Sequence, residues 1–479
     1  MNQTKKTNWR WWICLLLFVA TTINYMDRQV LSLTWKDYIA PEFHWTDSDY
    51  GTITGFFSIF YAVASLFAGR FVDWMGTKKG YLWAIFVWSV GACLHAACGW
   101  ATMHIEGIES IEALKALEAG SQAALVVATV SVWLFLVCRA ILALGEAGNF
   151  PAAIKVTAEY FPKKDRAYAT SLFNAGSSVG ALAAPLSIPI LADAFGWEMA
   201  FIIIGVLGFI WMFFWMYMYE KPQQSKHVSA AELEYILQDE KNAPVEEKKV
   251  SGKEEKTIPF FDCFRYRQTW SFITGKFFTD GVWWFYLFWA PAYFSECGYS
   301  MQTTTGKMLV FVLYLIVTVV SIFGGYLPKL FVEKKGMEPY AGRMLAMLIF
   351  AFFPLFALFA QPLQGISVWF PAIIIGLAGA GHQAWSANLF STIGDMFPKS
   401  TIATITGIGT MAGGIASFLI NKGAGMLFDY AAESNMTFLG FVGKPAGYFI
   451  IFCICAVAYI IAWSIMKTLV PKHKPIVLD

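Results

Sequence analysis

The feature that most restricts this chain is a series of long stretches that contain no Asp, Glu, Lys or Arg. They cover residues 11–26, 50–69, 80–105, 119–138, 167–192, 199–219, 281–294, 308–328, 344–394, 400–421 and 445–466. The stretch 344–394 is too long for one span, and the turn-like segment Gln361-Pro362-Leu363-Gln364-Gly365 divides it. A transmembrane helix needs about 20 mostly apolar residues. The sequence therefore predicts an all-α membrane protein with twelve transmembrane helices.

The composition supports a membrane protein and excludes several other classes. Of the 479 residues, 57% are hydrophobic and 14% are charged, whereas an ordinary soluble domain is about 45–50% apolar and about 25% charged. The 35 basic and 33 acidic residues give a net charge of only +2, so we expect no nucleic-acid partner. The expected surroundings of the chain are the lipid bilayer.

The distribution of Lys and Arg predicts the orientation, because cytoplasmic loops carry an excess of these residues. With a cytoplasmic N-terminus, 18 of them in short loops and tails lie inside and 5 lie outside. The loop between the sixth and seventh spans adds 9 more inside. An even number of spans then puts both termini in the cytoplasm. The three basic residues left within predicted spans are Arg28, Arg139 and Lys276.

The chain divides into two halves with weak internal similarity. We expect a first six-helix half at 1–219, a cytoplasmic connector at 220–267 and a second six-helix half at 268–479. Phe161-Pro162-Lys163 recurs 236 residues later as Phe397-Pro398-Lys399. A second pair of similar segments, nearer the start of each half, is separated by 256 residues. An extra loop at 104–122 of the first half accounts for the difference of 20. Two halves in the same orientation are a transporter architecture.

This repeat pairs charged positions of the first half with aromatic or neutral positions of the second half. At the offset of 236, Glu146 corresponds to His382, and at 256 Asp27-Arg28 corresponds to Trp283-Trp284. A substrate with an anionic end and a hydroxylated body would suit a cavity between two such halves.

Six charged residues fall within or at the start of predicted spans, namely Asp27, Arg28, Arg139, Glu146, Lys276 and Asp280. The spacings of seven residues (Arg139 to Glu146) and four residues (Lys276 to Asp280) put each pair on one helix face. A charge at mid-bilayer costs about 2.5–3.5 kcal/mol, so these groups should face a cavity or each other. An arginine suits a carboxylate ligand, and a carboxylate beside it can exchange a proton as the substrate arrives or leaves. The alternative is internal ion pairing that only holds helices together. For Lys276 and Asp280 both interpretations stay open.

Neutral polar and aromatic side chains within the spans are further candidates. Those able to bind hydroxyl groups are Tyr25, Asn174, Ser177, Ser178, Gln383, Ser386 and Asn388. Any one of them could instead form an interhelical hydrogen bond. Trp284 and Trp385 lie deep enough in their spans to stack on a sugar ring.

Two enzyme-like patterns lie inside spans, where small residues for helix packing explain them. Gly176-Ser177-Ser178-Val179-Gly180 matches a nucleophile motif that needs a strand–turn–helix context. Gly407-Ile408-Gly409-Thr410-Met411-Ala412 imitates a dinucleotide-binding loop without a preceding strand. We therefore expect no enzyme, no cofactor and no metal site. Because the sequence has no ATP-binding motif, the energy for transport would come from a gradient.

The segment Gly69-x-x-x-Asp73-x-x-Gly76-Thr77-Lys78-Lys79 resembles the loop 2–3 signature of the major facilitator superfamily. The resemblance implies a twelve-helix fold of two halves. It also implies that Gly69, Asp73, Gly76, Lys78 and Lys79 gate the cytoplasmic side. Trp74 stands where a basic residue is common in that signature.

Within the superfamily, the chain resembles the anion:cation symporter family and is most similar to hexuronate transporters. The segments that carry this resemblance are 24–28 (NYMDR), 145–152 (GEAGNFPA), 173–181 (FNAGSSVGA), 324–328 (GGYLP) and 381–388 (GHQAWSAN). The resemblance implies import of glucuronate- or galacturonate-like sugar acids together with protons. It further implies a monomer in a bacterial inner membrane.

The resemblance also suggests a role for each candidate. Asp27 and Glu146 would couple protons, Arg28 would pair with Asp27 or reach the substrate carboxylate, and Arg139 would control Glu146. The candidate substrate-binding residues are Tyr25, Arg28, Arg139, Asn174, Lys276, Trp284, Gln383, Trp385, Ser386 and Asn388. The alternatives are a carrier of another organic anion (galactonate, glucarate or an aromatic acid), an exporter of a small solute, and a membrane-embedded enzyme or sensor.

Overall fold

The twelve predicted spans all overlap helices in the structure, a computed structural model that describes residues 7–238, 258–398 and 401–476; span 80–105 and the first part of 344–394 are each divided among shorter helical segments. The long helices of the first half are α1 (Trp9–Thr34), α3 (Asp47–Met75), α4 (Thr77–His95), α5 (Cys98–Glu106), α7 (Gln122–Glu146), α8 (Asn149–Tyr160), α9 (Lys163–Phe195) and α10 (Trp197–Met218). Short elements join them: η1 (Trp35–Ile39), α2 (Ala40–Phe43) and α6 (Ile111–Lys115).

The second half repeats this arrangement after two short connector helices, α11 (Ala230–Ile236) and η2 (Asp262–Arg265). Its helices are α14 (Arg267–Glu296), α15 (Thr304–Lys335), α16 (Pro339–Ala351), η3 (Phe353–Phe359), α17 (Ala360–Gln364), α18 (Trp369–Met396), α19 (Ile402–Glu433) and α20 (Lys444–Leu469). A two-stranded hairpin of β1 (Thr437–Phe438) and β2 (Phe441–Val442) lies between α19 and α20.

Within the described residues, eight helices are long and apolar enough to cross a membrane, or nine when the bent pair α4 and α5 counts as one span. The pair bends by 51° at its break. Helices α1, α14 and α18 cover the remaining three predicted spans. All three carry buried polar residues, such as Arg28, Lys276 and His382, which lower their apolar content. That all twelve cross the membrane stays a prediction.

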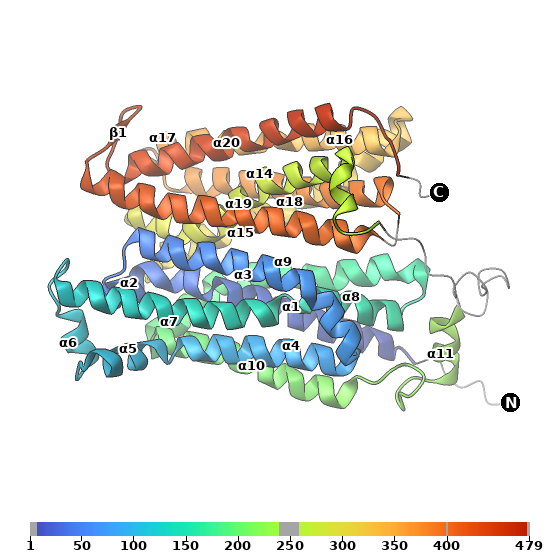
Figure 1. Ribbon diagram of the computed structural model, residues 1–479, viewed down its shortest axis with the longest axis horizontal. Helices are drawn as coiled ribbons and strands as arrows, with labels where there is room; N and C mark the ends of the chain where they lie inside the picture. Colours follow the sequence, from blue (N-terminus) through green and yellow to red (C-terminus); the bar gives the residue numbers. More distant parts are fainter. Residues whose placement is uncertain (1–6, 239–257, 399–400, 477–479) are drawn as a thin grey trace.

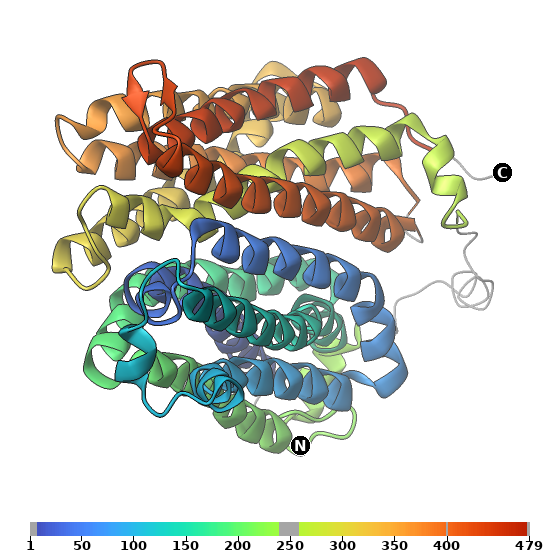
Figure 2. The same cartoon turned by 60° about the vertical axis from the view of Figure 1, so that its left-hand side comes forward.

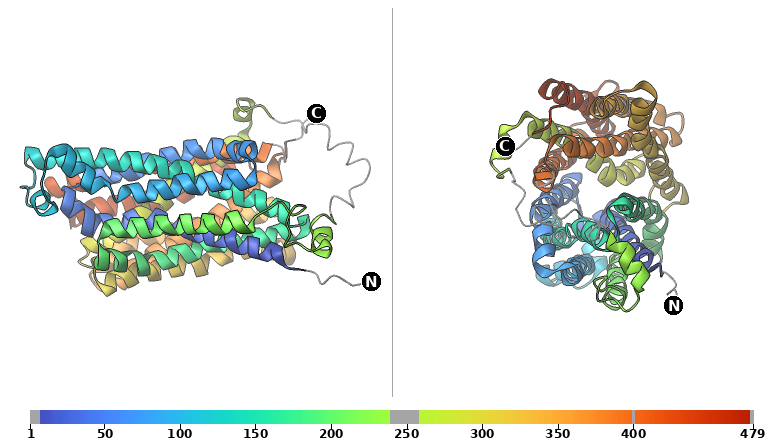
Figure 3. Two further views of the ribbon diagram at one scale, coloured as in Figure 1. Left: turned by 90° about the horizontal axis from the view of Figure 1, so that it is seen from below. Right: turned by 90° about the vertical axis from the view of Figure 1, so that its right-hand side faces the viewer.

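The two halves lie side by side, and both chain termini are at the same end of the bundle (Figure 1). We call this the terminal end, and the opposite end, which carries α2, α6 and the hairpin, the distal end (Figure 1). Seen from the terminal end, the helices form two groups, one from each half of the chain (Figure 3, right). Helix α3 of the first half packs along α19 of the second half (Figure 2).

Small residues allow α3 and α19 to approach closely. A Cβ atom added to Gly51 of α3 would lie 2.5 Å from the carbonyl oxygen of Asn421, and one added to Gly425 of α19 would lie 2.3 Å from that of Asp47. Any larger residue at these positions would push the two helices apart. Close backbone contact at small residues is a usual mode of helix association in membranes.

The described start of the connector is attached to the first half. The carboxylate of Glu232 in α11 is fully buried and accepts hydrogen bonds from Thr7 Oγ1 (2.5 Å), Trp9 N (3.0 Å) and Arg10 N (3.1 Å). It therefore caps the first turn of α1, where unpaired N–H groups favour an anion. Tyr235 also donates to Asp165 of α9, at 2.6 Å. The domain limits at 219 and 268 stay predictions.

Candidate functional site

A buried ion pair joins α1 and α7 of the first half. Arg28 donates from Nε (3.1 Å) and Nη2 (2.8 Å) to the same oxygen of Glu146, Oε2. Glu146 is fully buried and Arg28 is 5% exposed. The other carboxylate oxygen, Oε1, has no hydrogen-bond partner among the described residues. A guanidinium and a carboxylate held on two different helices form a contact that a helix movement would change.

The expected pairing of Arg28 with Asp27 is not found. Adjacent residues on an α-helix point about 100° apart, so the two side chains leave α1 in different directions. Asp27 is fully buried, and neither of its oxygens accepts a hydrogen bond from a described residue. Its carboxylate makes no ion pair with a described residue but interacts electrostatically with Glu146, Arg139 and Arg28. Arg139, 2% exposed, likewise has Nε and Nη1 atoms without a described hydrogen-bond partner. These two groups thus retain free hydrogen-bonding capacity in the interior.

Four aromatic rings surround the Arg28 guanidinium. Its Cζ atom lies 4.7 Å from the ring centre of Tyr61, 5.1 Å from Trp284, 5.4 Å from Tyr25 and 6.0 Å from Phe57. Three of these residues belong to the first half, whereas Trp284 comes from α14 of the second half. Arg28 therefore lies where the two halves meet. Sequence reasoning missed Phe57 and Tyr61, because a chain with 43 Phe and 20 Tyr residues offers no signal to select them.

The second half contains a separate buried ion pair within α14. Lys276 Nζ lies 2.5 Å from Asp280 Oδ2, and the two residues are 6% and 8% exposed. The ammonium also lies 4.7 Å from the ring of Phe390, and a Cβ atom at Gly413 would meet the Asp280 carboxylate at 2.3 Å. The pair is thus buried and tightly packed, which favours the structural interpretation, and a substrate-binding role for Lys276 stays a prediction.

Of the four candidates on α18, two are buried and two are half-buried. Asn388 is buried, and its amide donates to the carbonyl oxygens of Gly324 and Ala384, both at 2.8 Å. Trp385 is fully buried and packs edge-on against Tyr459, with the ring centres 5.5 Å apart. Gln383 and Ser386 are half-buried. Asn388 therefore forms the interhelical hydrogen bond that was the alternative to a binding role.

The candidates on α1 and α9 are more accessible. Tyr25 is half-buried beside Arg28, Asn174 is exposed, and Ser177 and Ser178 are half-buried. Ser177 donates a hydrogen bond to the carbonyl oxygen of Asn174, at 2.7 Å. Binding roles for these residues stay predictions.

The predicted gating segment forms a tight turn between α3 and α4. Gly76 alone separates the two helices, with φ of +78°, a conformation that favours glycine. The neighbouring Thr77 donates to Glu159 (2.6 Å), and Trp215 donates to the carbonyl oxygen of Lys78 (3.2 Å). Gly69 and Asp73 lie on α3, and the Asp73 side chain lies outside the described part. Lys79 is exposed. The turn is therefore held against α8 and α10.

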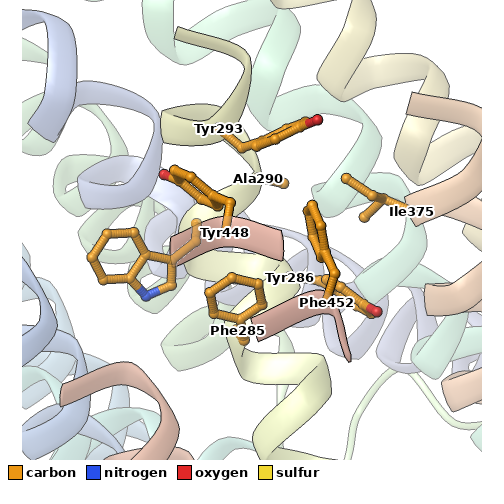
Figure 4. Close-up of a pocket in the computed structure, with 8 residues that line it drawn as sticks. Phe285, Tyr286, Ala290, Tyr293, Ile375, Tyr448 and Phe452 are labelled. Atoms are coloured by element: carbon orange, nitrogen blue, oxygen red, sulfur yellow. The ribbon is translucent and has the colours of Figure 1, made fainter. Parts of the chain in front are cut away.

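A small pocket in the second half lies apart from these charges (Figure 4). Its lining is apolar and mostly aromatic, from Phe285, Tyr286, Trp289, Ala290, Tyr293, Ile375, Tyr448 and Phe452. The lining has no charged side chain, and its polar side-chain groups are the hydroxyls of Tyr286, Tyr293 and Tyr448 and the indole N–H of Trp289. In the described ranges, no group of three or more His, Cys, Asp or Glu side chains is placed to hold a metal ion.

Comparison with known proteins decides the family. The sequence model of the Major Facilitator Superfamily matches residues 17–420. The chain belongs to this superfamily. The two halves of the structure agree with this assignment. The protein is thus a multi-pass integral membrane transporter and not an enzyme, as expected from the sequence.

Individual relatives confirm the resemblance to hexuronate transporters. The chain is 28% identical to the hexuronate transporter of Escherichia coli (strain K12) over 425 residues, 88% of each chain. It is also 28% identical to the galacturonate transporter of Dickeya chrysanthemi over 328 residues, 67% of this chain and 82% of the other. Among solved structures, that of a D-xylose-proton symporter matches with a TM-score of 0.66 and 17% identity, over 97% of this chain and 99% of the other. The chain therefore shares its fold with the symporter, and its sequence is more similar to those of the two sugar-acid carriers.

Proposed function

We propose that this transporter imports hexuronates such as glucuronate or galacturonate by proton symport with alternating access. The observation that carries the proposal is the buried Arg28–Glu146 ion pair at the meeting point of the halves. A guanidinium there can bind a carboxylate through two parallel hydrogen bonds. The hexuronate and galacturonate transporters among its relatives support this substrate class.

The charges of the site favour uptake of one proton with each anion. Arg28, Arg139, Asp27 and Glu146 sum to zero when all are ionised. An arriving carboxylate competes with Glu146 for Arg28, and the displaced Glu146 then takes up a proton. Anion and proton together leave the net charge unchanged, so the loaded site avoids burying an uncompensated charge, which is costly in a low-dielectric interior. Return of Glu146 to Arg28 after substrate release would expel the proton.

The aromatic rings around Arg28 suit the body of a sugar acid. The C–H faces of a pyranose ring can pack on Trp284 and Tyr61, and the hydroxyl groups of Tyr25 and Tyr61 can bond its hydroxyl groups. We propose further that the termini are cytoplasmic, that the coupling ion is H⁺ without any cofactor, and that the transporter is a monomer of a bacterial inner membrane.

The test is uptake of labelled glucuronate into proteoliposomes with and without an imposed pH gradient. Glu146→Gln should abolish gradient-driven uptake while exchange of labelled for unlabelled substrate continues, because the amide can leave Arg28 but cannot carry a proton. Asp27→Asn should likewise lose gradient-driven uptake and keep exchange if Asp27 carries a second proton. Glu333→Gln, an exposed residue in a surface ion pair with Lys329, is the control. Gradient-driven uptake by Glu146→Gln at the wild-type rate would disprove the coupling role.

Competition identifies the substrate class. Galacturonate should compete with labelled glucuronate, and the neutral analogue glucose should not, since Arg28 needs a carboxylate. Galactonate or glucarate as the strongest competitor would favour a carrier of another organic anion. Outward pumping of glucuronate against its gradient would favour an exporter.

A further inference from the structure

Three consecutive residues of η1, at the distal end of α1, hold together elements of both halves. Lys36 lies 2.5 Å from Glu296 of α14. Asp37 accepts hydrogen bonds from Ser295 Oγ (2.5 Å) and from the backbone N–H of Met301 (2.7 Å). The η1 turn is a π-helix, a wide turn that often occurs at functional sites. Lys36 and Asp37 of this turn both contact the second half.

The third residue extends the contact to a second pair of helices. Tyr38 donates to Asp193 of α9 (2.6 Å), which also receives Lys307 of α15 (2.6 Å). Asp193 and Lys307 belong to different halves, so this ion pair also fastens one half to the other.

Four charges form a closed ring next to these contacts. The two lysines alternate with the two carboxylates around the ring, with Lys36 and Asp47 from the first half and Lys444 and Glu296 from the second half. The successive distances are 3.2 Å from Lys36 to Asp47, 2.6 Å from Asp47 to Lys444, 2.9 Å from Lys444 to Glu296 and 2.5 Å back to Lys36. The side chains are between 2% and 29% exposed, so water screens the ring only in part. Each lysine touches both carboxylates, and removal of one lysine would leave two carboxylates competing for the other.

A buried aromatic layer adjoins this ring. Trp35 stacks on Tyr50 with the ring centres 4.0 Å apart, and Trp289 of the second half meets both rings edge-on at 5.8 Å and 5.0 Å. All three are fully buried, and the hydroxyl of Tyr50 donates to the carbonyl oxygen of Phe288 across the halves (2.8 Å). Trp35 follows Arg28 by seven residues, which is roughly 10 Å along a helix. The layer therefore separates the Arg28 site from the distal end.

The contacts between the halves are concentrated in this part of the molecule. The hydrogen bonds and ion pairs that we find between described residues of the two halves all involve residues 36–58 or Asp193 of the first half. The gating segment predicted from the sequence lies at the other end of α3.

We infer that the ring of Lys36, Asp47, Lys444 and Glu296, with the layer of Trp35, Tyr50 and Trp289, is the distal gate of the transporter. When the gate is closed, the ring clamps the halves and the layer excludes water from the Arg28 site. When the halves separate at this end, the ring opens and a sugar acid can enter from the distal side. The inference rests on alternating access as proposed above, and its residues are distinct from the predicted cytoplasmic gate.

The experiment measures amide hydrogen exchange of the purified full-length protein without substrate. Exchange reports local opening, so it tests the gate whatever the substrate is. In Lys444→Gln, residues 35–47 and 296–303 should exchange about fivefold faster than in the wild type, the size expected for losing partly buried ion pairs. Lys329→Gln, which removes an exposed lysine from α15 far from the ring, should leave them unchanged.

A double variant separates a gate from general destabilisation. Lys36→Gln with Glu296→Gln removes two neighbouring charges and leaves the Lys444–Asp47 pair intact. Its amide exchange should be slower than that of Lys36→Gln alone. Removing Lys36 alone leaves both carboxylates competing for Lys444, whereas the double variant also removes one of these carboxylates, so the two effects are not additive. Equal exchange in Lys444→Gln and wild type, or additive effects in the double variant, would overturn the inference. Absence of glucuronate uptake with the predicted exchange pattern would instead disprove the proposed substrate and keep the gate.

Discussion

The two halves of this transporter bury charge in different ways. In the first half, Arg28 and Glu146 come from different helices, and Asp27 and Arg139 beside them have polar atoms without a hydrogen-bond partner among the described residues. In the second half, Lys276 and Asp280 pair one turn apart on α14. An ion pair between two helices changes when the helices move, whereas a pair within one helix moves as a unit. The first half is therefore suited to couple a charge rearrangement to movement, and the second half is suited to stay rigid.

The internal repeat makes this difference more specific. The sequence offsets relate Glu146 to His382 and Asp27-Arg28 to Trp283-Trp284. In the structure Trp283 stacks on His382, with ring centres 5.3 Å apart and planes 5° from parallel. The contact between the first and fourth helices is thus present in both halves. In the first half Arg28 makes this contact as an ion pair, and in the second half Trp283, the counterpart of the neighbouring Asp27, makes it as an aromatic stack.

The largest expected effect comes from removing the cation of the first half. Arg28→Ala should lower glucuronate uptake by more than about 100-fold, because it removes the substrate anchor and leaves Glu146 buried without its partner, a loss of about 3–5 kcal/mol. Arg28→Lys should recover only a small part, since an ammonium cannot form the planar two-point contact. Initial uptake rates measure the effect, with Arg265→Ala, which alters an exposed arginine of the connector helix η2, as the control. Near-normal uptake by Arg28→Ala would indicate a neutral substrate.

An intermediate effect is expected for the one aromatic ring that the second half contributes to the Arg28 site. Trp284→Ala should raise the KM for glucuronate about tenfold, corresponding to about 1.4 kcal/mol, with a smaller change in kcat. The matched variant Trp385→Phe alters a tryptophan that packs on Tyr459 inside the second half, and it should leave KM within about twofold. If Trp385→Phe raised KM more than Trp284→Ala did, the substrate would be assigned to a position near α18 and not near Arg28.

The smallest effect is expected for the ion pair of α14. Lys276→Met combined with Asp280→Asn should keep uptake within about threefold, because replacing a buried pair by neutral groups is often close to neutral. Asp280→Asn alone should lower the unfolding temperature more than the double variant does, since it leaves a buried lysine unpaired. Thermal unfolding and uptake of the same preparations measure both. Loss of uptake in the stable double variant would assign Lys276 to the substrate.

Much of the fold could be predicted from the sequence, because a bilayer imposes simple limits on length and charge. The uncharged stretches predicted where the helices lie. The charged residues Arg28 and Glu146 within the predicted spans indicated where the buried ion pair lies. The partner of Arg28 could not be chosen correctly, since Asp27 is adjacent in sequence but diverges on the helix surface. Long-range contacts such as Lys36 with Glu296 gave no sequence signal, because charged residues at helix ends are common in any membrane protein.

Helix α1 joins the three parts of the molecule that the charges mark. Glu232 caps the first turn of this helix, and Arg28 lies toward its C-terminal end. The helix then continues into η1 at the distal gate. With 26 residues and a rise of about 1.5 Å per residue, it is a lever roughly 39 Å long. A tilt of about 10° around its midpoint would displace each tip by roughly 3 Å. Directed away from Glu296, that displacement would lengthen the 2.5 Å contact of Lys36 to roughly 5.5 Å, beyond the limit of about 4 Å for an ion pair, so a small tilt of α1 can release one contact between the halves.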